Sequence, residues 1–225
     1  TRPLFPVPVK AYEPLPDADE TIDFGNFAHG SRVRGRQIAL TFDLVDSAEG
    51  LSTVLAVLAD YRIRATFFAG GDFIRNNPGA VREVAASGHE VGSLFYTHFN
   101  MTDPRYGVTP DFIKQGLARN EDEYFAATGK ELSLLWHAPY YVVRSDIIRA
   151  AADMGYAHIG RDVDSLDWVS GRDDYGTSRL YRPAAELVER IMEKKKPGSI
   201  VSLRIGRPED SGNAGRRGDY MYRKL

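Results

Sequence analysis

Short apolar runs alternate with segments of helical periodicity along most of the chain. The runs have the length of buried strands, and we expect strands over residues 38–42, 65–68, 90–93, 132–136, 157–159 and 199–203. Between them, apolar residues recur at the spacing that lines one face of a helix, over residues 51–58, 81–86, 110–128, 145–151 and 183–192. Strands and helices that alternate in this way predict an α/β domain with a parallel sheet.

The two ends of the chain have a different composition. Five prolines between Pro3 and Pro16, followed by an acidic stretch, disfavour helix and central strand. We therefore expect an extended, proline-rich arm over residues 1–35 and one barrel domain over residues 36–225. Residues 207–223 are rich in Gly, Arg and Asp, as loops are, and residues 220–225 read as the start of a helix that is cut off. This pattern indicates a chain truncated at its C-terminal end.

Charge and composition narrow the classes of partner. A net charge of -2 over 225 residues argues against a general binder of nucleic acids or anionic membranes, and favours a neutral or polar ligand. The chain has no cysteine, so disulfides, thiolate nucleophiles and zinc-thiolate sites are excluded. No apolar run is long enough to span a membrane, and the first ten residues lack the pattern of a signal peptide.

The expected barrel indicates where reactive side chains should lie. Reacting groups in such barrels lie at the carboxyl ends of the strands, where this chain has Asp43, His98, His137, Asp164, Asp167 and Arg204. A single Asp after a strand more often caps the next helix than carries chemistry. Only the set as a whole therefore indicates a site.

The blocks that contain these residues resemble the polysaccharide deacetylases of carbohydrate esterase family 4, the NodB homology domain. The resemblance covers residues 36–206 and rests on Leu40-Thr41-Phe42-Asp43, Thr66-Phe67-Phe68, Gly88-His89-Glu90-Val91-Gly92 with Tyr96-Thr97-His98, Ala138-Pro139-Tyr140, Asp164-Ser165-Leu166-Asp167-Trp168 and Pro197-Gly198-Ser199-Ile200. It implies a distorted barrel of seven or eight β/α units. It also implies metal-dependent hydrolysis of N-acetyl groups on chitin-like or peptidoglycan-like chains, with zinc held by one Asp and two His.

Two of the three implied metal ligands are missing. Asp43 matches the family's catalytic base, but Leu44 stands where the family has its metal-binding aspartate. Leu94 replaces the first histidine of an i, i+4 pair, which leaves His98 as the one retained ligand. Zinc sites use three or four protein ligands, so we expect no metal cofactor here.

The groups that would move protons have also changed. His137 replaces the arginine that orients the base, and Arg204 replaces the histidine acid. An arginine stays protonated at physiological pH and cannot return a proton to a leaving amine. We predict that His137 contacts Asp43, and that Asp167 forms a bidentate ion pair with the Arg204 guanidinium.

The resemblance and its departures together predict an inactive relative that binds glycan or serves a structural role. Tyr140, whose backbone N–H is an oxyanion donor in the family, and Trp168 would wall the groove, and aromatic walls stack on sugar rings. The family's usual substrates imply a location outside the cytoplasm.

Two other interpretations stay open. The chain could be an active carbohydrate N-deacetylase, a hydrolase of amide C–N bonds, in which Asp46 joins Asp43 and His98 around a rearranged zinc site. It could also be a scaffold whose N-terminal arm docks to another protein.

Overall fold

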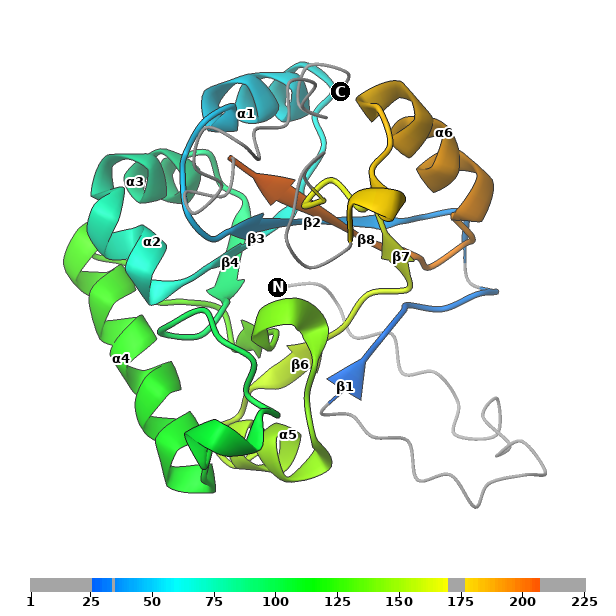
Figure 1. Cartoon of the computed structure of the whole chain (residues 1–225). Helices are drawn as coiled ribbons and strands as arrows, with labels where there is room; N and C mark the ends of the chain where they lie inside the picture. The colour runs from blue at the N-terminus through cyan, green and yellow to red at the C-terminus, as the bar shows by residue number, and fades with distance from the viewer. Residues whose placement is uncertain (1–25, 34, 170–176, 207–225) are drawn as a thin grey trace, which may run out of the picture.

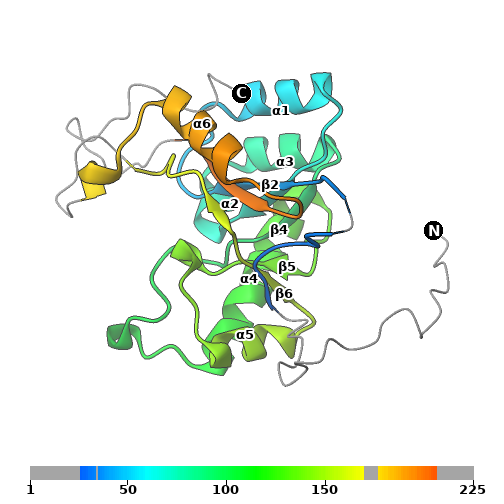
Figure 2. The same ribbon diagram turned by 90° about the vertical axis from the view of Figure 1, so that its right-hand side faces the viewer.

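Eight parallel strands form one sheet that curls into an incomplete barrel, with the helices on its outer side (Figures 1 and 2). The computed structural model describes residues 26–33, 35–169 and 177–206. The strand order is β1-β6-β5-β4-β3-β2-β8-β7. The strands are β1 Asn26–Phe27, β2 Ala39–Leu44, β3 Thr66–Ala69, β4 Glu90–Ser93, β5 Leu135–Trp136, β6 Ala157–Ile159, β7 Val163–Asp164 and β8 Ile200–Ile205. The expected distorted β/α barrel is confirmed.

The helices follow the periodic segments of the sequence. They are α1 Leu51–Asp60, α2 Gly71–Asn76, α3 Pro78–Ala86, α4 Pro110–Thr128, α5 Ser145–Ala152 and α6 Ala184–Lys194, with short 3-10 turns η2 Pro104–Tyr106, η3 Pro139–Tyr141 and η4 Thr177–Leu180. Local signals set the bounds of α4. The Thr109 hydroxyl accepts the N–H of Phe112 at 3.2 Å, Pro110 fills the first turn, and Gly129 ends the helix at φ 68. No described helix is long and apolar enough to cross a bilayer.

The segment expected as an arm contributes one strand to the sheet. Asn26 pairs with His158 and Phe27 with Ile159, so β1 extends the sheet beyond β6. The Asn26 side-chain oxygen also lies 2.9 Å from His158 Nδ1. Residues 1–25 of the expected arm and residues 207–225 of the expected tail lie outside the described residues.

The side chains of β2 point alternately to the side of the sheet that the helices cover and to the inside of the barrel. Phe42 and Leu44 are buried in the main core, among apolar residues of α1, α3 and α6. Asp43 faces the other way, because successive side chains in a strand point to opposite faces. In the register of the sheet, Asp43 lies between Phe68 of β3 and Arg204 of β8. The parallel sheet thus brings distant polar residues to one end of the barrel.

Candidate functional site

A pocket of about 200 Å³ opens at the carboxyl ends of the strands. It collects seven of the residues that the sequence singled out, namely Asp43, His98, His137, Tyr140, Asp167, Trp168 and Arg204. It is also lined by five that sequence reasoning did not assign, namely Val45, Tyr141, Arg161, Ser202 and Leu203. The expected site is therefore one continuous cavity.

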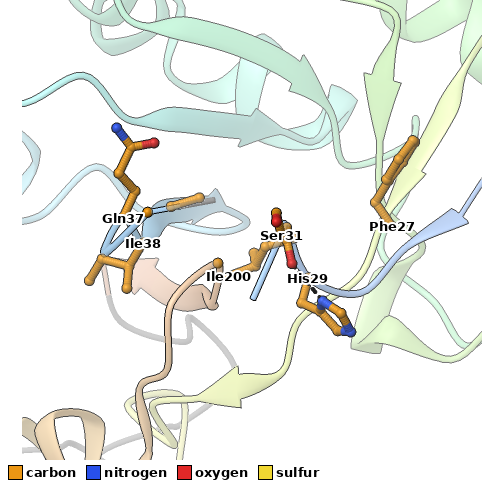
Figure 3. A pocket seen from close by; sticks show the side chains of 10 residues that line it. Phe27, His29, Ser31, Gln37, Ile38 and Ile200 are labelled. Atoms are coloured by element: carbon orange, nitrogen blue, oxygen red, sulfur yellow. Dashed lines mark hydrogen bonds between the residues drawn. The ribbon is translucent and has the colours of Figure 1, made fainter. Parts of the chain in front are cut away.

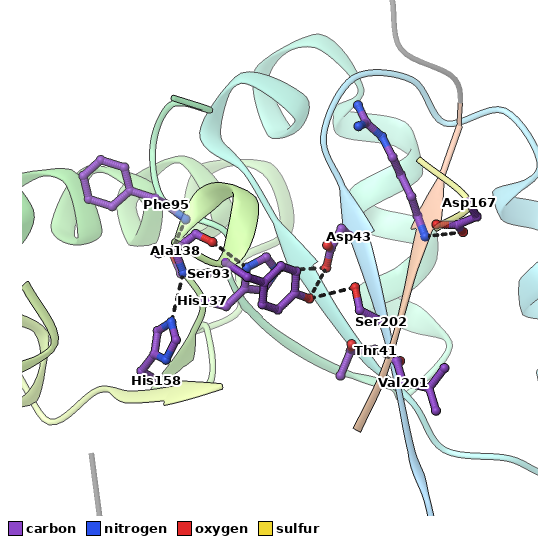
Figure 4. A network of polar contacts seen from close by, with 12 residues as sticks. Thr41, Asp43, Ser93, Phe95, His137, Ala138, His158, Asp167, Val201 and Ser202 are labelled. Atoms are coloured by element: carbon purple, nitrogen blue, oxygen red, sulfur yellow. Dashed lines mark hydrogen bonds and ion pairs between the residues drawn. The ribbon is translucent and has the colours of Figure 1, made fainter. Parts of the chain in front are cut away.

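Asp43 and His137 form a direct contact at the floor of this pocket, as predicted (Figure 4). His137 Nε2 lies 2.8 Å from Asp43 Oδ1, and His137 Nδ1 lies 3.1 Å from the carbonyl oxygen of Ala138. The His137 side chain is almost fully buried, whereas 13% of the Asp43 side chain is exposed. The ring therefore bridges the Asp43 carboxylate and the backbone carbonyl of Ala138 and fixes the position of the carboxylate.

Tyr141 and Ser202 extend the contact into a network that the sequence did not reveal. The Tyr141 hydroxyl lies 3.3 Å from Asp43 Oδ1 and 3.0 Å from Ser202 Oγ. Its ring stacks on His137 at a centroid distance of 4.2 Å. Burial, reinforced by the charge of Asp43, holds the pKa of Tyr141 well above its ordinary value, so the phenol stays neutral. Ser202 could have been found from its position two residues before Arg204, on the same face of β8.

The loops around the pocket contain four residues other than glycine with left-handed backbone. Phe95 follows β4, Tyr140 and Tyr141 follow β5, and Leu166 follows β7, with φ between 59 and 72. Such residues cost free energy, and they persist where the surrounding structure holds them in place. Because these four residues all lie at the mouth of the barrel, we infer that the surrounding structure holds the backbone of the pocket in a fixed shape.

The predicted ion pair between Asp167 and the Arg204 guanidinium is wrong. Asp167 accepts the backbone N–H of Arg204 at 2.8 Å and the Ser165 hydroxyl at 2.8 Å. The guanidinium instead makes a direct ion pair with Asp46. Asp167 is already satisfied by the backbone of β8, which leaves the long arginine side chain to reach the loop after β2. Burial raises the pKa of Asp167 to about 7, against the effect of its two hydrogen bonds.

Two further aromatic side chains, Trp168 and Tyr140, line the pocket. The Trp168 indole N–H donates to Asp164 Oδ1 at 3.2 Å, and Asp164 is held in turn by Arg161 at 2.6 Å. The Arg161 guanidinium also lies over the Tyr141 ring, 4.1 Å from its centroid. Tyr140 is 56% exposed. The pocket therefore offers an indole face and a phenol face to a ligand.

His98 lies beside Tyr140 and carries no charge at neutral pH. Its ring centroid is 4.4 Å from that of Tyr140. Burial is the main cause that lowers the pKa of His98 to about 4, and the charge of Asp43 opposes it. Among the described residues, no hydrogen-bond partner of the His98 ring is found, so its nitrogens are available to a ligand.

The two leucines at the family's ligand positions do not reach the pocket. Leu44 is fully buried in the core that faces the helices. Leu94 is packed with Val45 and Phe68 in a small apolar cluster, and the Phe68 ring lies 4.7 Å from that of His137. Neither leucine is among the residues that line the cavity. Val45 and Leu203 instead provide aliphatic side chains to the lining of the pocket.

The donor set does not fit a zinc ion. Of the possible ligands, Asp43 is engaged by His137 and Tyr141, and Asp46 is engaged by the Arg204 guanidinium. Within residues 26–33, 35–169 and 177–206, no group of three or more His, Cys, Asp or Glu side chains could hold a metal ion. Zinc sites need at least three such ligands. The pocket instead contains a positive charge of the protein itself, the Arg204 guanidinium.

Sequence comparison relates this barrel to enzymes that act on N-acetylated glycans. The sequence profile of the polysaccharide deacetylase family matches residues 30–159. A chitooligosaccharide deacetylase of Sinorhizobium fredii is 30% identical over 174 residues, which cover 77% of this chain and 74% of that protein. The peptidoglycan-N-acetylmuramic acid deacetylase PdaA of Bacillus subtilis is 28% identical over 168 residues, covering 75% of this chain and 59% of that protein.

Solved structures share the fold. The Bacillus anthracis protein BA3943, described as a CE4 family pseudoenzyme, superposes with a TM-score of 0.70 at 24% identity, over 86% of this chain and 62% of that chain. The structure of Bacillus subtilis PdaA, a family 4 carbohydrate esterase, gives a TM-score of 0.70 at 23% identity, over 84% of this chain and 75% of that chain. With the profile match and the relatives above, the chain belongs to the polysaccharide deacetylase family.

Proposed function

We propose that this chain binds an N-acetylated glycan of the chitin or peptidoglycan type without hydrolysing it. The observation that carries the proposal is the direct ion pair that Asp46 makes with Arg204, a residue that lines the pocket together with Trp168 and Tyr140. The names of the relatives, chitooligosaccharide and peptidoglycan deacetylases, support the glycan class. They also support a location outside the cytoplasm, where cell-wall glycans are found.

Loss of catalysis follows from the chemistry of the groups that remain. Hydrolysis of an amide in this family depends on a metal that polarises the carbonyl and activates a water. Arg204 brings a fixed positive charge close to the oxygen ligands, which opposes the binding of a second cation. Arg204 also stands in place of the proton donor and keeps its own proton.

Binding does not need any of the lost groups. Trp168 and Tyr140 can stack on the apolar faces of a sugar ring, and the neutral His98 can exchange hydrogen bonds with sugar hydroxyls. The contact between Asp43 and His137 gives the floor a polar surface for an acetamido group. A small apolar pocket with a few fixed polar groups is the usual form of such a site.

One observation favours the competing function, an active deacetylase with a rearranged centre. The pKa of Asp167 is raised to about 7, so a share of these carboxyl groups carries a proton at neutral pH and could serve as the acid in place of the lost histidine. This alternative also needs Asp46 to leave Arg204 and join Asp43 and His98 around zinc.

Calorimetric titration with N-acetylated chito-oligosaccharides and soluble peptidoglycan fragments tests the proposal. We expect binding that weakens about tenfold in Trp168→Ala, because the loss of one stacking face costs roughly 1 kcal/mol or more. Phe125→Ala is the matched control, since Phe125 is 54% exposed on α4 and is not among the residues lining the pocket. Unchanged affinity in Trp168→Ala would refute glycan binding in this pocket. Release of acetate by zinc-loaded protein would favour the active enzyme.

A further inference from the structure

The opposite end of the barrel, where the strands begin, carries a second distinct surface. We define the basal surface as Val33, Arg36, Ile38, Tyr61, Arg62, Ile63, Arg64, Lys195 and Lys196. The sheet brings these segments together. Thr41 pairs with Thr66, which sets the residues before β3 beside those before β2. The Gly198 N–H donates to the carbonyl oxygen of Gln37 at 2.7 Å, which sets the end of α6 beside the same segment.

The basal surface exposes large apolar side chains. Val33 is 91% exposed, Tyr61 74%, Ile38 42% and Ile63 39%. Two of them, Ile38 and Ile63, precede the adjacent strands β2 and β3. Grouped apolar exposure of this kind marks an interaction site more often than isolated exposed residues do.

Cations line a hollow beside one of these apolar side chains, Ile38. A hollow of about 320 Å³ is lined by Arg36, Ile38, Lys195, Lys196 and Pro197, with no acidic residue among them. In the described part of the chain, neither Arg36 nor the two lysines make an ion pair. The end of α6 also places its partial negative charge near Lys195 and Lys196, which explains their position but not the absence of counter-ions.

Arg62 adds a cation at a position that favours glycine. It follows the last turn of α1 with φ 55, the left-handed conformation that glycine adopts most easily at helix ends. The other left-handed residues besides glycine in the described segments lie at the mouth of the barrel. Arg62 is therefore a strained residue that lies away from the mouth, and such residues are often found at functional sites.

A larger, mainly apolar hollow adjoins the cationic one. It has a volume of about 460 Å³, and its lining includes Phe27, His29, Ile38 and Ile200 (Figure 3). Ile38 lines both hollows. An apolar hollow beside a cationic one matches a ligand that has an anionic head and an apolar chain.

From this arrangement we infer that the basal surface docks on a bilayer that contains anionic phospholipids. The lysines and arginines would meet the lipid phosphates, while Val33 and Tyr61 enter the headgroup region. The net charge of -2 does not contradict this, because it averages over the whole chain, whereas the lining of the hollow formed by Arg36, Lys195 and Lys196 contains no acidic residue. Docking of this kind turns the pocket at the carboxyl ends of the strands away from the membrane.

Sedimentation of the full chain with lipid vesicles tests the inference. We expect binding to vesicles of equal phosphatidylcholine and phosphatidylglycerol, weakening with salt, and little binding to phosphatidylcholine alone. The double variant Lys195→Glu with Lys196→Glu should bind at least about 25-fold more weakly, since each basic residue contributes roughly fivefold. The control, Arg105→Glu with Lys114→Glu, makes the same change in net charge in η2 and α4 and should bind as the unmodified chain does.

Three results would overturn the inference. They are equal binding to neutral and anionic vesicles, an equal loss in the control variant, and self-association of the chain that Lys195→Glu with Lys196→Glu abolishes. A second variant, Val33→Ser with Tyr61→Ser, should weaken vesicle binding without changing the circular dichroism spectrum. Glycan affinity should be unchanged in all of these variants, so the two proposals can fail separately.

Discussion

Replacing Asp167 by asparagine tests how charge is arranged in the pocket. The carboxyl accepts a backbone N–H from β8 and the Ser165 hydroxyl, while the Arg204 guanidinium pairs with Asp46. An asparagine side chain at this position would keep the shape and could serve both neighbours, because its oxygen accepts the N–H and its amide donates to the hydroxyl. The substitution therefore removes an ionisable group and little else.

The raised pKa of Asp167 determines whether stability rises or falls with pH. The pKa of Asp167 is about 7 in the folded chain and about 3.9 when unfolded. Between these values the folded chain binds a proton that the unfolded chain has lost, so stability falls as pH rises from about 4 to about 7. Three pKa units correspond to about 4 kcal/mol, and partial contact with solvent reduces the expected loss to roughly 2 kcal/mol.

Urea unfolding of Asp167→Asn at pH 4 and pH 8 measures this difference. We expect nearly equal stability of variant and unmodified chain at pH 4, and a variant more stable by about 2 kcal/mol at pH 8. Asp122→Asn, at an exposed position of α4, should show no such dependence. If the guanidinium of Arg204 faced Asp167, the carboxylate would be stabilised and Asp167→Asn would lose stability at pH 8. That outcome would refute the assignment.

Two further predictions concern the pocket and the core behind it. Leu44→Asp should destabilise the fold by several kcal/mol, since it buries an unpaired charge among apolar side chains, and chemical denaturation would show this. Tyr141→Phe should cost about 1 kcal/mol of stability, measured by urea unfolding, because Asp43 and Ser202 lose a shared hydrogen-bond partner.

Local patterns were sufficient to predict most elements of the barrel. Pro110 marks the beginning of helix α4 and Gly129 marks its end. Both signals are local, because each acts on the helix turn next to it. Strand β5 is shorter than the expected segment and begins at Leu135. Strand β1 was missed because two residues have too little periodicity to be recognised without their partner β6.

In the pocket, contacts between strands decided what could be predicted. The contact of His137 with Asp43 was predicted from the family resemblance, in which the residue at position 137 orients the base, and the structure confirms it. Arg204 faces the mouth as expected, but which carboxylate it meets depends on side-chain direction and on a competing backbone N–H. Tyr141 turns inward through a left-handed backbone that no propensity of tyrosine would indicate.

Metal content tests the central claim most directly. The full chain, equilibrated with excess zinc, separated from free ions by gel filtration and analysed for elements, should contain only a small fraction of one zinc per chain. Stoichiometric zinc in the unmodified chain, lost on His98→Ala, would contradict the account.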